Sequence, residues 1–210
     1  MSDQARRVLE RLYAGATRAE DLPWHEPEPP ALLARAVAAR GAPGRALDLG
    51  CGAGTFSMWL AARGYQVTAL DFMPQAVRIA SERVRQADLD VTVAQADVTA
   101  DETRAAHPGP FDIILDVGCL HGLSDEQRPA YKRQILSWLA SDGDYILLHF
   151  GRRGFWDQWP IGPRRISREQ IAGYFAPELR EAAFDPKVVR GMPLMMGGSA
   201  AINRYWFKRS

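Results

Sequence analysis

The sequence predicts an α/β fold in which a doubly wound, mostly parallel sheet carries helices on both faces. From residue 45 onward, short apolar segments alternate with segments of helical periodicity. Two of the apolar segments, FDIILDV at 111–117 and YILLHF at 145–150, are nearly continuous, as in strands buried on both faces. A turn with three alternate glycines, within 50–54, joins the first apolar segment to the next helix.

The first 42 residues are expected to form a helical and proline-rich cap, followed by a single domain at 43–210. Residues 1–22 carry an apolar face at helical spacing. That face consists of Val8, Leu9, Leu12 and Tyr13. The proline-dense segment PWHEPEPP at 23–30 excludes a regular helix or a central strand, and a second helix is expected at 31–40.

The first half of the domain alternates strictly between strand and helix. The strand at 45–49 is apolar, and the glycine turn starts a helix at 55–63. A strand at 66–70 ends at Asp71, and the helix that follows carries apolar residues for packing. The further elements are a helix at 74–86, a strand at 91–96 ending at Asp97, a weak helix at 99–107 broken by 108–110, and the strand at 111–117.

The second half continues with a helix at 125–139 and the strand at 145–150. After a loop at 151–166, Ser167 is a good cap for a helix at 167–175. The last two predicted strands are 179–189 and 201–208.

The glycine turn indicates a nucleotide-cofactor loop, and its spacing narrows the choice. A phosphate-binding P-loop needs a Lys-Ser/Thr pair that is missing here. A dinucleotide fingerprint needs a third glycine where this chain has Thr55 or Ser57. The form D-x-G-x-G-x-G from Asp48 to Gly54 instead resembles motif I of the class I S-adenosylmethionine-dependent methyltransferases. A bare glycine turn between strand and helix is the alternative.

The resemblance covers about residues 42–210, and the final strand pair resembles the antiparallel end of that family's seven-stranded sheet. It implies that Asp48 and the glycine backbone hold the amino-acid end of the cofactor and that Asp97 meets the adenine amino group. The position of Asp71 suits ribose hydroxyls, although nicotinamide enzymes place an acid similarly. Each Asp alone could instead cap a strand or a helix. The expected cofactor-binding residues are Trp24, Asp48, Gly50, Cys51, Gly52, Gly54, Asp71, Phe72, Met73, Asp97, Val98 and Asp116.

The segment DVGCLHGL after the strand at 111–117 resembles the corresponding loop of methyltransferases related to the thiopurine and tellurite-resistance enzymes. In that group the loop lies between the cofactor methyl group and the acceptor, which implies substrate contacts for Cys119 and His121. A histidine with an ordinary pKa could remove a proton near neutral pH, so His121 is the expected catalytic residue. A structural histidine bonded to backbone is the alternative.

Aromatic residues flank the predicted site. Phe155, Trp156 and Trp159 lie in the loop after the strand at 145–150 and are expected to contact the substrate. Trp24 lies in the proline-rich segment, which resembles the cofactor-covering extension of the thiopurine group. Packing of this extension onto the sheet edge is the alternative for Trp24.

Charge and composition limit the partners. With 26 basic and 25 acidic residues the net charge is +1, so nucleic acid is not expected as a partner. No segment reaches the roughly 18 apolar residues of a membrane span, and no signal peptide is expected. Cys51 and Cys119 form no disulfide framework, which fits a cytoplasmic setting, and no ligand pair has the spacing of a metal site. A monomer or weak dimer is expected.

Together these features predict transfer of a methyl group from S-adenosylmethionine to a small, thiol or phenol-like acceptor by in-line displacement. Sulfur, oxygen, nitrogen and carbon acceptors all stay open, because one fold hosts many reactions. An NAD(P)-dependent oxidoreductase and a cofactor-binding regulatory protein without turnover are the alternative functions.

Overall fold

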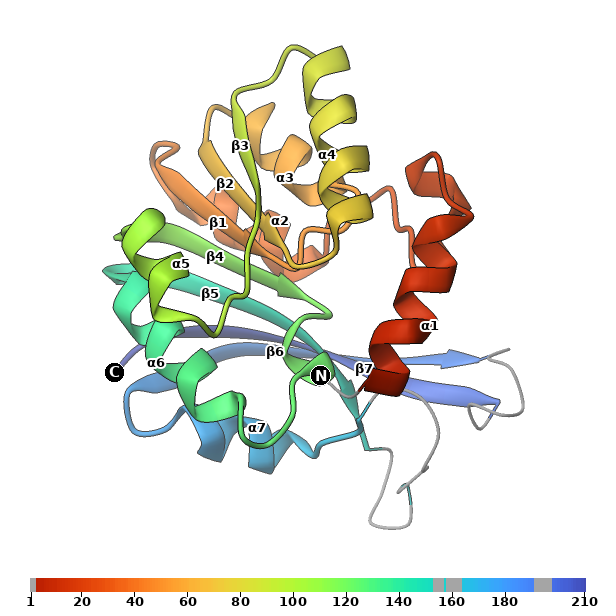
Figure 1. Ribbon diagram of the computed structural model, residues 1–210. Coiled ribbons are helices and arrows are strands. Elements are labelled where there is room, and N and C mark those ends of the chain that lie inside the picture. Colours follow the sequence, from red (N-terminus) through yellow and green to blue (C-terminus); the bar gives the residue numbers. More distant parts are fainter. Residues whose placement is uncertain (1–2, 153–156, 158–163, 191–197) are drawn as a thin grey trace.

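The computed structural model describes residues 3–152, 157, 164–190 and 198–210. These residues form a seven-stranded sheet in the order β3-β2-β1-β4-β5-β7-β6 (Figure 1), which confirms the predicted fold class. The strands are β1 (Arg45–Leu49), β2 (Gln66–Asp71), β3 (Val91–Gln95), β4 (Phe111–Val117), β5 (Leu139–Gly151), β6 (Leu179–Arg190) and β7 (Ser199–Arg209).

Helices cover both faces of this sheet. The helices α2, α3 and α4 lie on one face, and α5, α6 and α7 lie on the other (Figure 1). The helices are α1 (Asp3–Ala14), α2 (Ala31–Ala39), α3 (Thr55–Ala61), α4 (Pro74–Gln86), α5 (Asp101–Ala106), α6 (Arg128–Trp138) and α7 (Arg168–Phe175), with short 3-10 turns η1 (Ala19–Asp21) and η2 (Leu120–Gly122). None of the helices in the described part of the chain combines the length and apolar character needed to cross a membrane.

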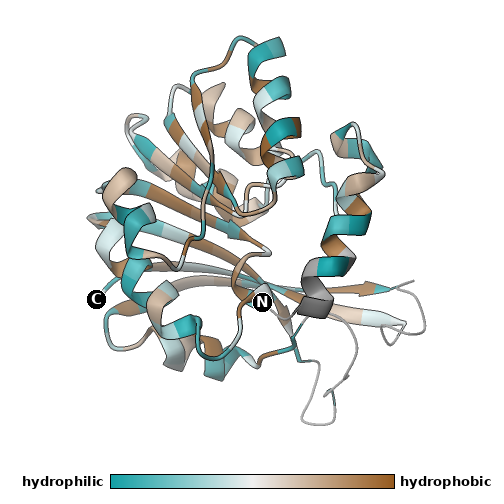
Figure 2. Ribbon diagram, viewed as in Figure 1, coloured by the Kyte–Doolittle hydropathy of each residue, from teal (hydrophilic) through white to brown (hydrophobic). Residues whose placement is uncertain are grey.

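The apolar sequences of the central strands explain why these strands are buried. The central strands β1 and β4 are buried along almost their whole length, as their continuous apolar runs predicted. Figure 2 shows the same separation, with hydrophobic residues along the central strands and hydrophilic residues on the outer sides of the helices. β1 to β5 pair in parallel, so their carboxyl ends meet at one edge, and β7 pairs antiparallel with both β5 and β6.

The N-terminal segment folds differently from the single helix expected at 1–22. α1 ends at Ala14, and the chain then turns because the Asp21 carboxylate accepts hydrogen bonds from the backbone N–H groups of Thr17 and Arg18, both at 2.9 Å. The turn brings Ala16, Ala19 and Leu22 into one buried cluster with residues of the glycine loop and α4. The division into a cap at 1–42 and a domain at 43–210 stays a prediction.

β5 is longer than expected, because it begins at Leu139 rather than at residue 145. Leu139 pairs with Phe111 before a register shift, and regular pairing with β4 resumes at Asp144. This irregular start contains Ser141, Asp142 and Gly143, whose polar, turn-forming character hid the strand from sequence reasoning.

Candidate functional site

The glycine loop between β1 and α3 requires glycine at each of its three positions. Gly50, Gly52 and Gly54 have φ angles of 69°, 56° and 73°, in the left-handed region that other residues avoid. The loop is also crowded: a Cβ atom on Gly50 would lie 3.1 Å from the Cβ of Cys119, and one on Gly52 would lie 3.3 Å from the hydroxyl of Tyr13. The loop is thus held between the segment after β4 and the N-terminal helix.

Asp71, at the end of β2, is tied to this loop. Its carboxylate accepts a 2.9 Å hydrogen bond from the Gly52 N–H and a 2.8 Å hydrogen bond from the Met73 N–H. The side chain is only 5% exposed, and burial raises the pKa of Asp71 above its usual range. The predicted ribose-binding carboxylate and the predicted glycine loop therefore form one hydrogen-bonded unit.

Two further carboxylates are buried at the same edge. Asp48 accepts a 2.5 Å hydrogen bond from the Ser57 hydroxyl, and burial raises the pKa of Asp48 to about 7. Asp116 accepts hydrogen bonds from Tyr131 and from the backbone N–H groups of Cys119 and Leu120, and burial raises its pKa to about 6. The proximity of the three acids adds to the shift of Asp48.

These three carboxylates have no cationic partner, unlike a buried carboxylate at the other edge of the sheet. There, Asp144 is paired with Arg40 at 2.8 Å and with Lys208 at 3.0 Å. Among the described residues, no Lys, Arg or His forms an ion pair with Asp48, Asp71 or Asp116. Because buried charge needs compensation, this edge suits a ligand that brings positive charge, as S-adenosylmethionine does with its sulfonium and ammonium groups.

The predicted adenine region lies beyond the end of β3. Asp97 is exposed, and its Oδ1 accepts hydrogen bonds from the backbone N–H and the hydroxyl of Thr99, at 2.8 and 2.6 Å. Asp97 therefore organises its own turn and keeps Oδ2 available. Val98, directly after Asp97, and Met73, after the end of β2, are buried, and Phe72 is half-buried.

The loop after β4 holds the predicted acceptor residues, with one difference from expectation. Burial, and then the charge of Arg128, lower the pKa of His121 to about 4, so this imidazole is neutral and weakly basic at pH 7. Gly118, with a φ of 104°, lets the ring fold back, since a Cβ there would lie 3.1 Å from His121 Cε1. Burial raises the pKa of the Cys119 thiol, which therefore stays protonated.

Three residues that lie at this edge are not among the predicted site residues. The hydroxyl of Tyr13 lies over Gly52, Tyr131 donates to Asp116, and the imidazole of His149 meets that of His121 edge to face with ring centroids 5.9 Å apart. For Tyr13 and Tyr131 the sequence indicated only that they lie in helices. His149 gave one available signal: it is a polar residue near the carboxyl end of an otherwise apolar strand.

Of the four aromatic residues predicted at the site, the structure describes Trp24. Trp24 is 44% exposed and packs edge to face on Tyr13, with ring centroids 5.6 Å apart, so it lies on the outside of the N-terminal segment next to the glycine loop. Phe155, Trp156 and Trp159 lie outside the described residues.

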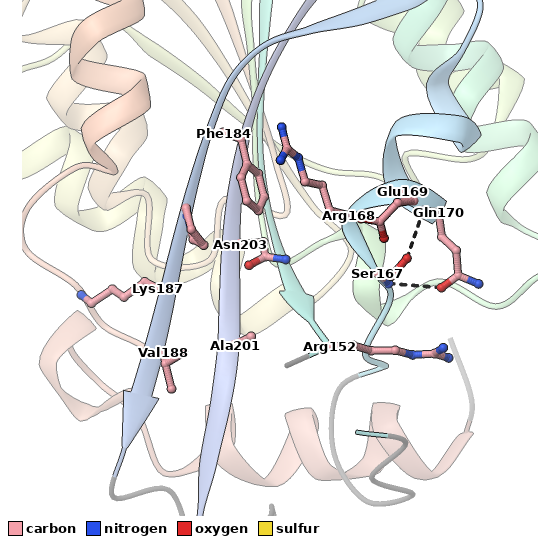
Figure 3. Close-up of a pocket in the computed structure, with 11 residues that line it drawn as sticks. Arg152, Ser167, Arg168, Glu169, Gln170, Phe184, Lys187, Val188, Ala201 and Asn203 are labelled. Carbon is pink, nitrogen blue, oxygen red and sulfur yellow. Dashed lines mark hydrogen bonds between the residues drawn. The ribbon is translucent and has the colours of Figure 1, made fainter. Parts of the chain in front are cut away.

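A cleft of about 620 Å³ opens between the start of α7 and the strands β6 and β7 (Figure 3). None of the predicted site residues in the described part of the chain lines it. Asn203 of β7 lines the cleft and pairs in register with His149 of the neighbouring strand β5. The cleft therefore lies next to β5, on the side of β7. Its lining comprises Arg152, Ser167, Arg168, Glu169, Gln170, Phe184, Pro186, Lys187, Val188, Ala201 and Asn203.

Fold, site and similarity together support a class I S-adenosylmethionine-dependent methyltransferase of the small-molecule type. Residues 46–143 match the family model of the methyltransferase domain. Over 185 residues, 86% of this chain and 76% of the relative, the sequence is 28% identical to the 2-heptyl-1-hydroxyquinolin-4(1H)-one methyltransferase of Mycobacteroides abscessus. Ubiquinone biosynthesis O-methyltransferases also match, but the chain spans only about two fifths of their length.

Two solved structures show the same fold over most of this chain. The N-methyltransferase NodS from Bradyrhizobium japonicum, in complex with S-adenosylhomocysteine, is 22% identical with a TM-score of 0.70, over 97% of this chain and 98% of its own. TehB from Haemophilus influenzae is 16% identical with a TM-score of 0.72, over 89% of this chain and 64% of its own. The match to the methyltransferase domain favours S-adenosylmethionine as the cofactor over the nicotinamide alternative.

Proposed function

We propose that the protein transfers the methyl group of S-adenosylmethionine to the oxygen or sulfur of a small, phenol-like or thiol acceptor. One contact carries this proposal: a Cβ on Gly50 would lie 3.1 Å from the Cβ of Cys119, so the glycine loop directly touches the loop that contains His121. A cofactor bound along the first loop and an acceptor bound along the second would be neighbours.

The proposed residue roles are those that the sequence resemblance implies. Asp71 accepts hydrogen bonds from the ribose hydroxyls, and Asp97 accepts one from the adenine amino group. Asp48 and the backbone of the glycine loop hold the amino-acid end of the cofactor. Trp24, Cys51, Phe72, Met73, Val98 and Asp116 complete the cofactor site. When bound, S-adenosylmethionine supplies a methyl group on a sulfonium leaving group.

The acceptor side acts mainly through position and exclusion of water. Cys119 stays protonated and provides apolar surface, and His121 is the polar group nearest the acceptor proton. With its pKa lowered to about 4, His121 is a weak base. An acceptor that ionises readily is therefore favoured over one that depends on strong base catalysis.

Similarity supports the same acceptor class. The Mycobacteroides abscessus relative acts, by its name, on a 1-hydroxyquinolinone, which carries a hydroxyl group on an aromatic ring system. Its alignment covers 86% of this chain and so extends beyond the cofactor motifs. Hydroxyquinolinones are accordingly the first acceptors to test here.

The test is transfer of labelled methyl from S-adenosylmethionine to a panel of phenols, hydroxyquinolinones, thiols and amines. We expect label on oxygen or sulfur with the wild-type protein and about tenfold or greater loss in Asp71→Ala at limiting cofactor. Label on amines alone would contradict the acceptor class. Tight binding of S-adenosylhomocysteine without transfer to any member would favour the regulatory alternative.

A further inference from the structure

Three basic side chains from three elements interact electrostatically beside the loop after β4. They are His121 of η2, His149 of β5 and Arg128 at the start of α6, and we call them the histidine–arginine cluster. The two imidazoles lie edge to face at 5.9 Å, and the positive charge of Arg128 contributes, after burial, to lowering the pKa of both. His149 is fully buried, and the Arg128 side chain is 12% exposed.

Several polar atoms of this cluster lack a hydrogen-bond partner among the described residues. They are His121 Nδ1, His149 Nε2, and Nε and Nη2 of Arg128, all of them buried. His149 Nδ1 lies 2.8 Å from the carbonyl oxygen of Phe150, which assigns the proton to Nδ1 and leaves Nε2 as an acceptor. Buried polar atoms without partners are costly in a folded protein, so a cluster of them marks a place where a ligand supplies the missing bonds.

The charge of the cluster defines the ligand. Both imidazoles are neutral near pH 7, because burial lowers their pKa to about 4 for His121 and about 3 for His149. Arg128 stays cationic, and its ion-pair partner among the described residues is Asp125, 4.0 Å from Nε. The Asp125 side chain is 65% exposed and also binds Arg164, so it compensates the buried guanidinium poorly.

We propose that Arg128 and His121 bind the methyl acceptor as an oxygen or sulfur anion, and that Arg128 selects for that ionised form. This inference rests on the proposed function. His149, whose Nε2 carries only a lone pair, packs against the His121 ring and does not contact the anion. A guanidinium donates two parallel hydrogen bonds to an anion, and its charge favours loss of the acceptor proton to solvent before methyl transfer. The acceptor lone pair then forms the new bond to the methyl carbon as the carbon–sulfur bond breaks, and that bond's electron pair stays on sulfur. No proton remains for His121 to remove, so its role is to donate its ring N–H to the acceptor anion.

The probe for this inference is 4-nitrophenol, whose absorbance distinguishes its ionised from its neutral form. It is titrated against pH with protein saturated with S-adenosylhomocysteine, so that binding is measured without turnover. We expect the wild type to bind the phenolate and to lower its apparent pKa. Arg128→Gln should weaken phenolate binding about tenfold or more and abolish the pKa change, and Arg128→Lys should retain part of both.

The matched control is Arg133→Gln, which removes an exposed arginine from the same helix and should leave the titration unchanged. Equal binding of S-adenosylhomocysteine by all variants establishes that they are folded. The inference is overturned if the wild type does not bind the phenolate, or if Arg128→Gln binds it as the wild type does. Failure of labelled methyl transfer in a wild type that does bind phenolate would instead count against the proposed function.

Discussion

The backbone N–H of Gly52 donates a 2.9 Å hydrogen bond to the buried carboxylate of Asp71. This bond joins the glycine loop after β1 to the end of β2, and the Met73 N–H adds a second bond of 2.8 Å to the same carboxylate. A carboxylate has about four acceptor positions, so Asp71 keeps acceptor capacity for the ribose hydroxyls of a cofactor. We therefore expect Asp71 both to shape the loop and to bind the ribose.

Asp71→Ala should therefore weaken S-adenosylhomocysteine binding by roughly 1.5–3 kcal/mol, because the ribose hydroxyls lose a charged acceptor. Isothermal calorimetry measures the affinity, and thermal unfolding monitors the accompanying loss of the Gly52 and Met73 bonds. Asp90→Ala is the matched control, since Asp90 is exposed at the opposite end of β3. Wild-type affinity in Asp71→Ala would remove Asp71 from the cofactor site.

Gly52→Val should abolish cofactor binding. The position has a φ of 56°, and the first carbon of the new side chain would already lie 3.3 Å from the Tyr13 hydroxyl. Gly173→Val is the control, because Gly173 is exposed on α7 and a Cβ there meets no atom within 4 Å. If calorimetry gives both variants the affinity of the wild type, the glycine loop is a simple turn.

Stability should respond to pH through the buried imidazoles. An unfolded histidine titrates near 6.5, whereas burial lowers the pKa of His149 to about 3. The unfolded chain therefore binds more protons than the native protein below about pH 6.5, and His149 destabilises the fold increasingly as the pH falls toward 4. Asp48 and Asp116 act with the opposite sign, because their raised pKa values cost stability as the pH rises toward 7.

His149→Gln isolates the histidine contribution. The free energy of unfolding of the variant relative to wild type should increase by roughly 1–3 kcal/mol between pH 7 and pH 4. Urea unfolding at several pH values provides the measurement. A difference that does not change with pH would show that His149 titrates alike in the native and unfolded states.

The N-terminal segment should be more protected from hydrogen exchange when cofactor is bound. Tyr13, Ala16 and Leu22 pack against the glycine loop and α4, so a ligand on that loop adds contacts to a small cluster. Exchange at 9–24 should slow on adding S-adenosylhomocysteine, whereas α7 should change little. Unchanged exchange at 9–24 would count against a cofactor-covering role for Trp24.

The sheet and the cofactor loop could be predicted from sequence because each depends on local pattern. The segment at 111–117 is apolar enough to be recognised as a buried strand from its sequence alone. The alternate glycines Gly50, Gly52 and Gly54 indicate a turn with positive φ angles, which all three adopt. Asp71 was placed correctly at the end of β2 because the strand before it is short and apolar.

The contacts between distant elements could not be predicted in this way. Tyr131 reaches Asp116 and His149 reaches His121 only after α6 and β5 have packed beside β4. The low pKa of His121 has the same origin, because burial depends on the assembled core rather than on the residue's neighbours in sequence. The same applies to the end of α1 at Ala14, which depends on the bonds that Asp21 makes.

A crystal structure of the protein with S-adenosylhomocysteine would locate the cofactor directly. We expect the ribose hydroxyls on Asp71, the adenine beside Asp97 and Val98, and the amino-acid end along Gly50–Gly54. Density for the ligand in the cleft at the start of α7, or anywhere away from the glycine loop, would contradict this placement.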